Sequence, residues 1–212
     1  MKPLANLHNN MIMPQPVQDR LLGIFEIGVK RSTERLSALT GMPWDIHIIS
    51  LDIKSDEIFR SILARDTEEF LGFSFSAPGE KYLVIFSQKT GKALLDASSF
   101  GPSAGRRPPP DMEPSVLAEI ANILIGGLEG ELADRQGMVR IISGPTTITN
   151  TKGAIYDQVF MDPPPFNQLI VNVLIHISSP KLAADCTLLL RLDSLNANFL
   201  LTIDPDARPI LP

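Results

Sequence analysis

Apolar residues recur three and four positions apart in two long stretches of the chain, which is the spacing of a helix with one buried face. In residues 16–39 they are Leu21, Ile24, Phe25, Leu36 and Leu39. In residues 115–136 they are Leu117, Ile120, Leu124 and Leu128. Gly41 and Gly137 follow these stretches, at the position where glycine commonly ends a helix. The pattern therefore predicts two long amphipathic helices, the second with Ser115 as its N-cap.

Shorter apolar runs, several of them alternating, predict strands after each long helix. In the first half the predicted strands are residues 44–51, 70–76 and 81–86. In the second half they are residues 138–143, 169–177 and 186–192. A short helix is expected after each set, at 87–97 and 193–201, and a further helix within 52–65. The main elements therefore follow the same order in both halves.

The two halves are also in register with each other. Asp19 and Ser115 are 96 residues apart, and so are Gly41 and Gly137. Two amphipathic helices can resemble each other by coincidence, but a matching order of elements over most of both halves favours an internal duplication.

Proline marks the boundary between the halves. Five of the 18 prolines fall in residues 101–114, a composition typical of a linker. We therefore predict a single domain over residues 17–212, made of two repeats at 17–100 and 115–203. Residues 1–16 are expected to form an irregular lead-in, which includes Pro14 and Pro16.

Composition narrows the class of protein. The chain has 212 residues and a formal charge of −5 with no basic stripe, which argues against nucleic acid as its main partner. A single cysteine, Cys186, excludes a disulfide framework, and its place in a predicted strand favours a buried apolar role. No apolar run approaches the roughly 18 residues that a membrane span requires, and no signal peptide is evident. We expect a cytoplasmic protein with no membrane partner.

One face of the second helix carries polar and small residues. With about 100° of rotation per residue, Ser115, Glu119, Asn122 and Gly126 fall on one narrow stripe, opposite the apolar face. Glycine within a helix costs up to about 1 kcal/mol relative to alanine. Gly126 and the nearby Gly127 and Gly130 therefore require a reason, such as the close approach of another helix or another protein.

A Glu and an Asn three residues apart on an exposed helix face are usually just solvated surface. The chemical interpretation is that an Asn amide, which both donates and accepts, holds a nucleophilic water in line with a phosphorus atom, as a glutamine does in GTPases. The Glu would then pair with a cation of the substrate protein. His8, His47 and His176 lack the spacing of a metal site, so we predict no metal of the protein's own.

The stripe resembles the motif of the CheC/CheX/FliY phosphatases of bacterial chemotaxis, which is Asp or Ser, three residues, Glu, two residues and Asn on a long, often duplicated helix. In SVLAEIANILIGG the matching residues are Ser115, Glu119 and Asn122. The sequence departs at Ala121, where the family commonly has glycine. The first helix aligns through Asp19, but Gly23 and Glu26 stand where its Glu and Asn would be.

This resemblance implies an α+β fold of two related units that share one sheet, with the two long helices side by side on one face. It also implies hydrolysis of the aspartyl phosphate of a CheY-like response regulator. Asn122 would orient the water, Glu119 would engage the regulator's active-site lysine, and Ser115 and Gly126 would support the site. The expected Mg²⁺ belongs to the regulator. We expect the first helix, with Gly23 and Glu26, to be structural or to dock a partner.

Other functions fit the same residues. The chain could bind a response regulator or a CheD-like protein without turnover, or form part of a flagellar switch or receptor array. It could also be an unrelated domain whose helices are alike by chance. The sequence leaves open whether the protein is a monomer or a homodimer.

Overall fold

The computed structural model describes residues 15–52, 56–98, 107–137, 139–160 and 171–202. The helices are α1 (Gln15–Thr40), α2 (Asp56–Leu63), α3 (Gln88–Ala97), α4 (Glu113–Gln136), α5 (Lys152–Phe160) and α6 (Ser194–Thr202). The strands are β1 (Asp45–Asp52), β2 (Phe70–Ala77), β3 (Glu80–Ser87), β4 (Thr146–Asn150), β5 (Val171–Ser179) and β6 (Ala184–Leu192). Each half of the chain contributes helix, strand, helix, strand, strand and helix, in that order.

The six strands form one antiparallel sheet with the order β1-β5-β6-β3-β2-β4. When each strand is exchanged for its counterpart in the other half, the order reads the same in reverse. The central pair, β3 and β6, is therefore a contact between counterparts from the two halves. The fold is α+β, a duplicated unit with a shared sheet, as the sequence predicted.

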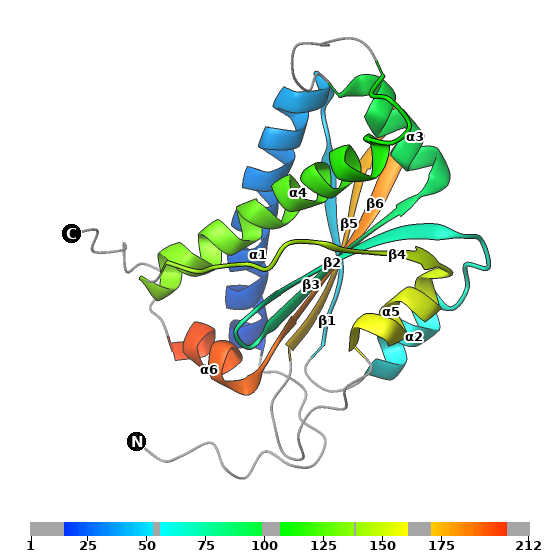
Figure 1. Ribbon diagram of the computed structural model, residues 1–212. Coiled ribbons are helices and arrows are strands. Elements are labelled where there is room, and N and C mark those ends of the chain that lie inside the picture. Colours follow the sequence, from blue (N-terminus) through cyan, green and yellow to red (C-terminus); the bar gives the residue numbers. More distant parts are fainter. Residues whose placement is uncertain (1–14, 53–55, 99–106, 138, 161–170, 203–212) are drawn as a thin grey trace.

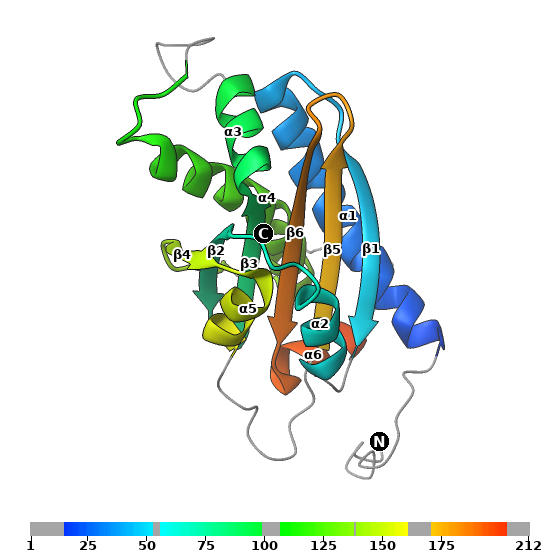
Figure 2. The ribbon, with the colours of Figure 1, turned by 90° about the vertical axis from the view of Figure 1, so that its right-hand side faces the viewer.

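The helices form layers on the two faces of this sheet (Figures 1 and 2). The long helices α1 and α4 lie side by side on one face, and α2 and α5 cover the other. Alternation along β5 separates the two cores: Val173 and Ile175 pack with the long helices, whereas Leu174 packs with α2 and α5. The long helices thus each keep one face toward the sheet and one toward solvent.

Contacts between α1 and α4 depend on glycine. A β-carbon on Gly28 would lie 2.9 Å from the α-carbon of Leu128, and one on Gly127 would lie 2.2 Å from Ser32 Oγ. The Ser32 hydroxyl donates hydrogen bonds to the carbonyls of Gly28 and Leu124. A shift of 96 residues relates Gly28 to Leu124 and Ser32 to Leu128, so the Gly28–Leu128 contact and the Ser32–Leu124 hydrogen bond join equivalent positions of the two halves. This close approach supplies the reason for Gly127.

Most elements predicted from the sequence are present. Both long helices, the short helices after β3 and β6, and the helix between β1 and β2 are confirmed, with ends that differ by a few residues. Gly41 and Gly137 end α1 and α4 with φ of 67° and 62°, the left-handed conformation that favours glycine. The stripe's opposite face, which includes Leu117, Ile120 and Leu124, is buried as expected.

Two predictions are wrong. Ser115 is not an N-cap, because α4 begins two residues earlier, at Glu113, with Met112 as its N-cap and Pro114 in its first turn. A strand was predicted at 138–143, but residues 139–143 form none, and β4 begins at Thr146 instead. In that stretch apolar side chains face solvent and a polar one faces inward: Val139 is 95% exposed, whereas the side chain of Arg140 is buried. Helix α5 was not predicted.

The predicted lead-in, residues 1–16, falls outside the described residues up to position 14, and so does much of the predicted linker. The linker's last two residues, Glu113 and Pro114, belong to α4. The repeat boundaries at 17–100 and 115–203 stay predictions. Within the described segments, no helix is long and apolar enough to cross a membrane.

We expect Gly127→Ala to lower the free energy of unfolding by about 1–3 kcal/mol, because the new β-carbon would meet the backbone of α1 at Ser32 and Gly28. The matched control is Gly130→Ala, three residues further along the same helix, where nothing lies within 4 Å of the added carbon. That variant should be stabilised by up to about 1 kcal/mol. Urea unfolding of the three proteins measures both effects, and equal stability of the two variants would contradict the close contact.

Candidate functional site on helix α4

Helix α4 brings the predicted stripe together on its outer face. Ser115, Glu119 and Asn122 are exposed, and Gly126 is half-buried. Glu119 and Asn122 lie three residues apart, so their side chains are neighbours on the helix surface. Neither forms a hydrogen bond or ion pair with any residue that the structure describes. The carboxylate and the amide are therefore available to a ligand on a helix that is itself fixed by the core.

The first helix presents the equivalent stripe without the same chemistry. Asp19 and Glu26 are exposed on α1, and the Asp19 carboxylate accepts a hydrogen bond from Gln15 Nε2 at 2.7 Å. A β-carbon on Gly23 would meet nothing within 4 Å, so this position is an open helix surface. Because α1 offers no amide at the Asn position, only α4 carries both polar groups of the motif.

Arg35 of α1 reaches the stripe of α4, a contact that was not predicted from the sequence. A β-carbon on Gly126 would lie 3.4 Å from Arg35 Nη1. The guanidinium thus lies against the bare backbone one turn beyond Asn122. No local pattern could have revealed this contact, because it depends on how α1 and α4 pack against each other.

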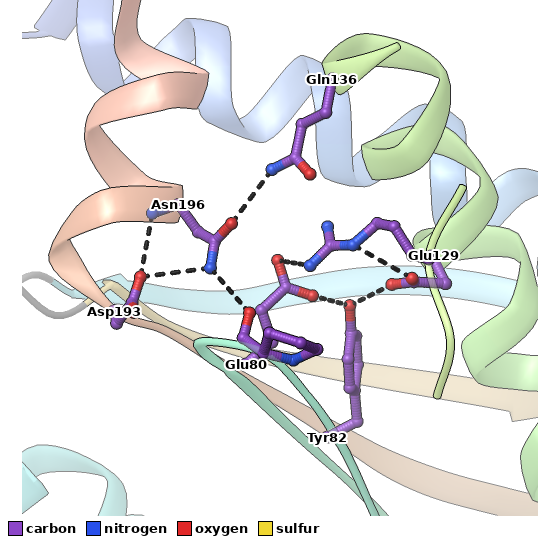
Figure 3. Close-up of polar contacts among 8 residues, drawn as sticks. Glu80, Tyr82, Glu129, Gln136, Asp193 and Asn196 are labelled. Carbon is purple, nitrogen blue, oxygen red and sulfur yellow. Dashed lines mark hydrogen bonds and ion pairs between the residues drawn. The ribbon is translucent and has the colours of Figure 1, made fainter. Parts of the chain in front are cut away.

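A buried polar cluster holds the C-terminal half of α4 to the sheet (Figure 3). Its four members are Glu80 and Tyr82 on β3, Glu129 on α4, and Arg140 in the segment after α4. Arg140 Nη2 lies 2.5 Å from Glu80 Oε1, and Arg140 Nε lies 3.2 Å from Glu129 Oε1. The Tyr82 hydroxyl contacts both carboxylates, at 2.6 Å for Glu129 Oε2. The cluster fixes both the end of α4 and the chain that leaves it.

The charges in this cluster do not balance when both carboxylates are ionised. One guanidinium faces two glutamates, and the Tyr82 hydroxyl has one proton to donate to two acceptors. Burial raises the pKa of Glu80, partly offset by its hydrogen bond from Tyr82 and its contact with Arg140. A protonated Glu80 can donate to the Tyr82 oxygen while Tyr82 donates to Glu129. Burial also raises the pKa of Tyr82, which keeps that proton in place.

A second group of contacts lies beside this cluster, at the start of α6 (Figure 3). Asn196 Nδ2 donates to the carbonyl of Pro78 at 3.1 Å, and its Oδ1 accepts from Gln136 Nε2 at 3.2 Å. Asn196 therefore joins the β2–β3 turn to the last residue of α4. Together the two groups position α4 on the sheet.

Groups able to hold a metal are absent from the described residues, where no three histidines, cysteines or carboxylates converge. His47 on β1 and His176 on β5 are direct cross-strand partners at the sheet surface. His8 lies outside the described residues. Cys186 is buried, as predicted, and burial raises the pKa of its thiol.

The chain has the fold of the CheC/CheX/FliY family. It is similar to FliY of Thermotoga maritima, with a TM-score of 0.62 and 14% identity over 90% of this chain and 96% of that one. It is also similar to the FliG–FliM complex from H. pylori, with a TM-score of 0.58 and 13% identity over 90% of this chain and 100% of that one. A third similar structure is the FliM middle domain from Vibrio alginolyticus, with a TM-score of 0.51 and 12% identity over 80% of this chain and 92% of that one. At these identities the likeness shows the fold. The sequence matches no protein-family model and no curated protein.

The Glu80 carboxyl predicts a pH dependence of stability. Because its pKa in the folded protein is raised, the stability that depends on its proton is fully present below the unfolded value of about 4.3 and is lost as pH rises through the folded value. Glu80→Gln keeps a donor for Tyr82 and an acceptor for Arg140 without this titration. We therefore expect the variant to gain stability relative to the wild type as pH rises from 5 to 8.

Urea unfolding at several pH values measures this difference. Glu119→Gln replaces an exposed carboxylate within the stripe itself; it is the control and should follow the wild-type curve. Parallel curves for the wild type and Glu80→Gln would show that Glu80 does not titrate with a raised pKa.

Proposed function

We propose that this protein hydrolyses the aspartyl phosphate of a CheY-like response regulator through one site on α4. The observation that carries the proposal is the pair Glu119 and Asn122. Both side chains are exposed, they are neighbours on the helix surface, and neither has a partner among the described residues. The opposite face of the same helix is buried against the core. Phosphoryl transfer requires positioning more than covalent help, so two side chains on a rigid helix suffice.

In the proposed reaction, the Asn122 amide accepts from and donates to one water, which it holds in line with the phosphorus atom. A bond forms between the water oxygen and phosphorus as the bond from phosphorus to the aspartate oxygen breaks, which yields phosphate, a carboxylate and a proton. Glu119 pairs with a lysine of the regulator and fixes the approach. Mg²⁺ is expected on the regulator, which is the substrate.

Ser115 and Gly126 have supporting roles in this proposal. The exposed Ser115 lies in the first turn of α4, where a small side chain leaves room for the partner's surface. Gly126 leaves the helix surface bare one turn beyond Asn122. The α1 stripe, with Asp19, Gly23 and Glu26, is proposed to have no hydrolytic role.

We expect Asn122→Ala to slow catalysed phosphate loss from a phosphorylated CheY-like regulator by about 100-fold or more, because the water is no longer oriented. The matched control is Glu26→Ala, which removes a polar side chain from the equivalent exposed position of α1. That variant should keep the wild-type rate. The proposal fails if Asn122→Ala is as active as the wild type.

A second candidate function is a non-catalytic component of a flagellar switch. The observation that favours it is the likeness to FliM, a partner of FliG in one of the similar structures. In that case the chain would form a stable complex with a FliG-like protein of its own organism and would not accelerate phosphate loss. Gel filtration of the mixed proteins tests this candidate, and separate elution with every FliG-like protein would exclude it. A CheD-like partner can be tested in the same way.

A further inference from the structure

Arg31 and Arg35 lie one turn apart on α1 but differ in their contacts with carboxylates. Arg31 is paired with Glu131 at 3.1 Å and with Asp134 at 2.8 Å, both on α4. Glu131 also pairs with Arg135 at 2.8 Å. The carboxylates at the C-terminal end of α4 are thus already matched by cations of the two helices.

Arg35 lies one turn further along α1 and has no such match. It is exposed, and within the described segments no carboxylate lies within ion-pair distance of it. Its guanidinium is not directed into solvent alone, because Nη1 lies 3.4 Å from the position of a β-carbon on Gly126. A larger residue at Gly126 would occupy the space beside Nη1. The glycine therefore gives the arginine its place at the edge of the stripe.

The position of this cation suits an anion presented to Asn122. Residues four apart on a helix have β-carbons about 5–6 Å apart, so the guanidinium lies about one helical turn from the Asn122 side chain. A water held by the amide and a phosphorus atom about 3 Å beyond it would bring the phosphoryl oxygens into that range. Guanidinium is also the side chain whose planar donors best match the oxygens of a phosphoryl group.

We propose that Arg35 is a third residue of the α4 site and contacts the phosphoryl oxygens of the phosphorylated partner while Asn122 orients the water. This inference rests on the proposed function and adds the group that balances the phosphoryl charge from the protein's side. The reaction is the hydrolysis described above, with no further co-reactant. Arg35 distinguishes the phosphorylated partner from the unphosphorylated one, because only the former carries the phosphoryl oxygens that the guanidinium contacts.

The test uses the CheY-like regulators of the same organism, phosphorylated with acetyl phosphate for turnover, or carrying beryllofluoride as a phosphoryl mimic for binding. Arg35→Ala should lower kcat at least about tenfold with a smaller change in KM. It should also abolish any preference of the protein for the beryllofluoride form, and Arg35→Lys should recover part of both. Because Arg35 is exposed, the unfolding midpoint should stay at the wild-type value.

Lys30→Ala is the control, since it removes another exposed cation from α1 and should leave kcat and the preference unchanged. Equal loss in Lys30→Ala and Arg35→Ala, equal weakening of both regulator forms, or full activity of Arg35→Ala would each overturn the assignment. If the wild type accelerates phosphate loss and Arg35→Ala matches it, only this inference fails. If the wild type accelerates none of the regulators, the proposed function and this inference fail together.

Discussion

The close approach of the α1 and α4 backbones sets the relative position of the two long helices, and the candidate site is built on that position. Gly28 and Gly127 let the two helices approach more closely than side chains would allow. Gly28 and Leu128, which are in contact, correspond to Leu124 and Ser32, which share a hydrogen bond, so the crossing point is built from equivalent positions of the two halves. It fixes the distance between the two exposed stripes, and it also places the Arg35 guanidinium over Gly126. A looser helix pair would separate the residues of the candidate site.

The buried cluster of Glu80, Tyr82, Glu129 and Arg140 has a different role. Buried charges cost desolvation energy unless they are paired and hydrogen-bonded, so such a cluster is a poor source of net stability. Its geometry is specific, however, because each group has a defined partner. It ties the segment after α4 to β3 and so fixes where the helix ends. The candidate site lies toward the other end of the same helix and benefits from that rigidity.

How far the fold could be predicted from the sequence depended on whether each signal was local. The long helices could be predicted because their apolar spacing is visible over many residues. The stretch after α4 could not be predicted correctly. Its apolar and polar residues alternate as in a strand, but apolar side chains are exposed there and a polar one is buried. Arg140 is inside and Val139 is outside, since the partners of Arg140 are Glu80 and Glu129, distant along the chain. Strand β4 buries only Ile148 among its five residues, which is too weak a pattern to recognise.

The candidate site divides in the same way. Glu119 and Asn122 share one helix, so their proximity followed from helical geometry alone, whereas Arg35 came to the site through tertiary packing. Whether the α4 site is catalytic can be measured as single-turnover phosphate loss from a phosphorylated CheY-like regulator of the same organism, with and without this protein. We expect the protein to accelerate this loss. An unchanged rate with every such regulator would contradict this expectation.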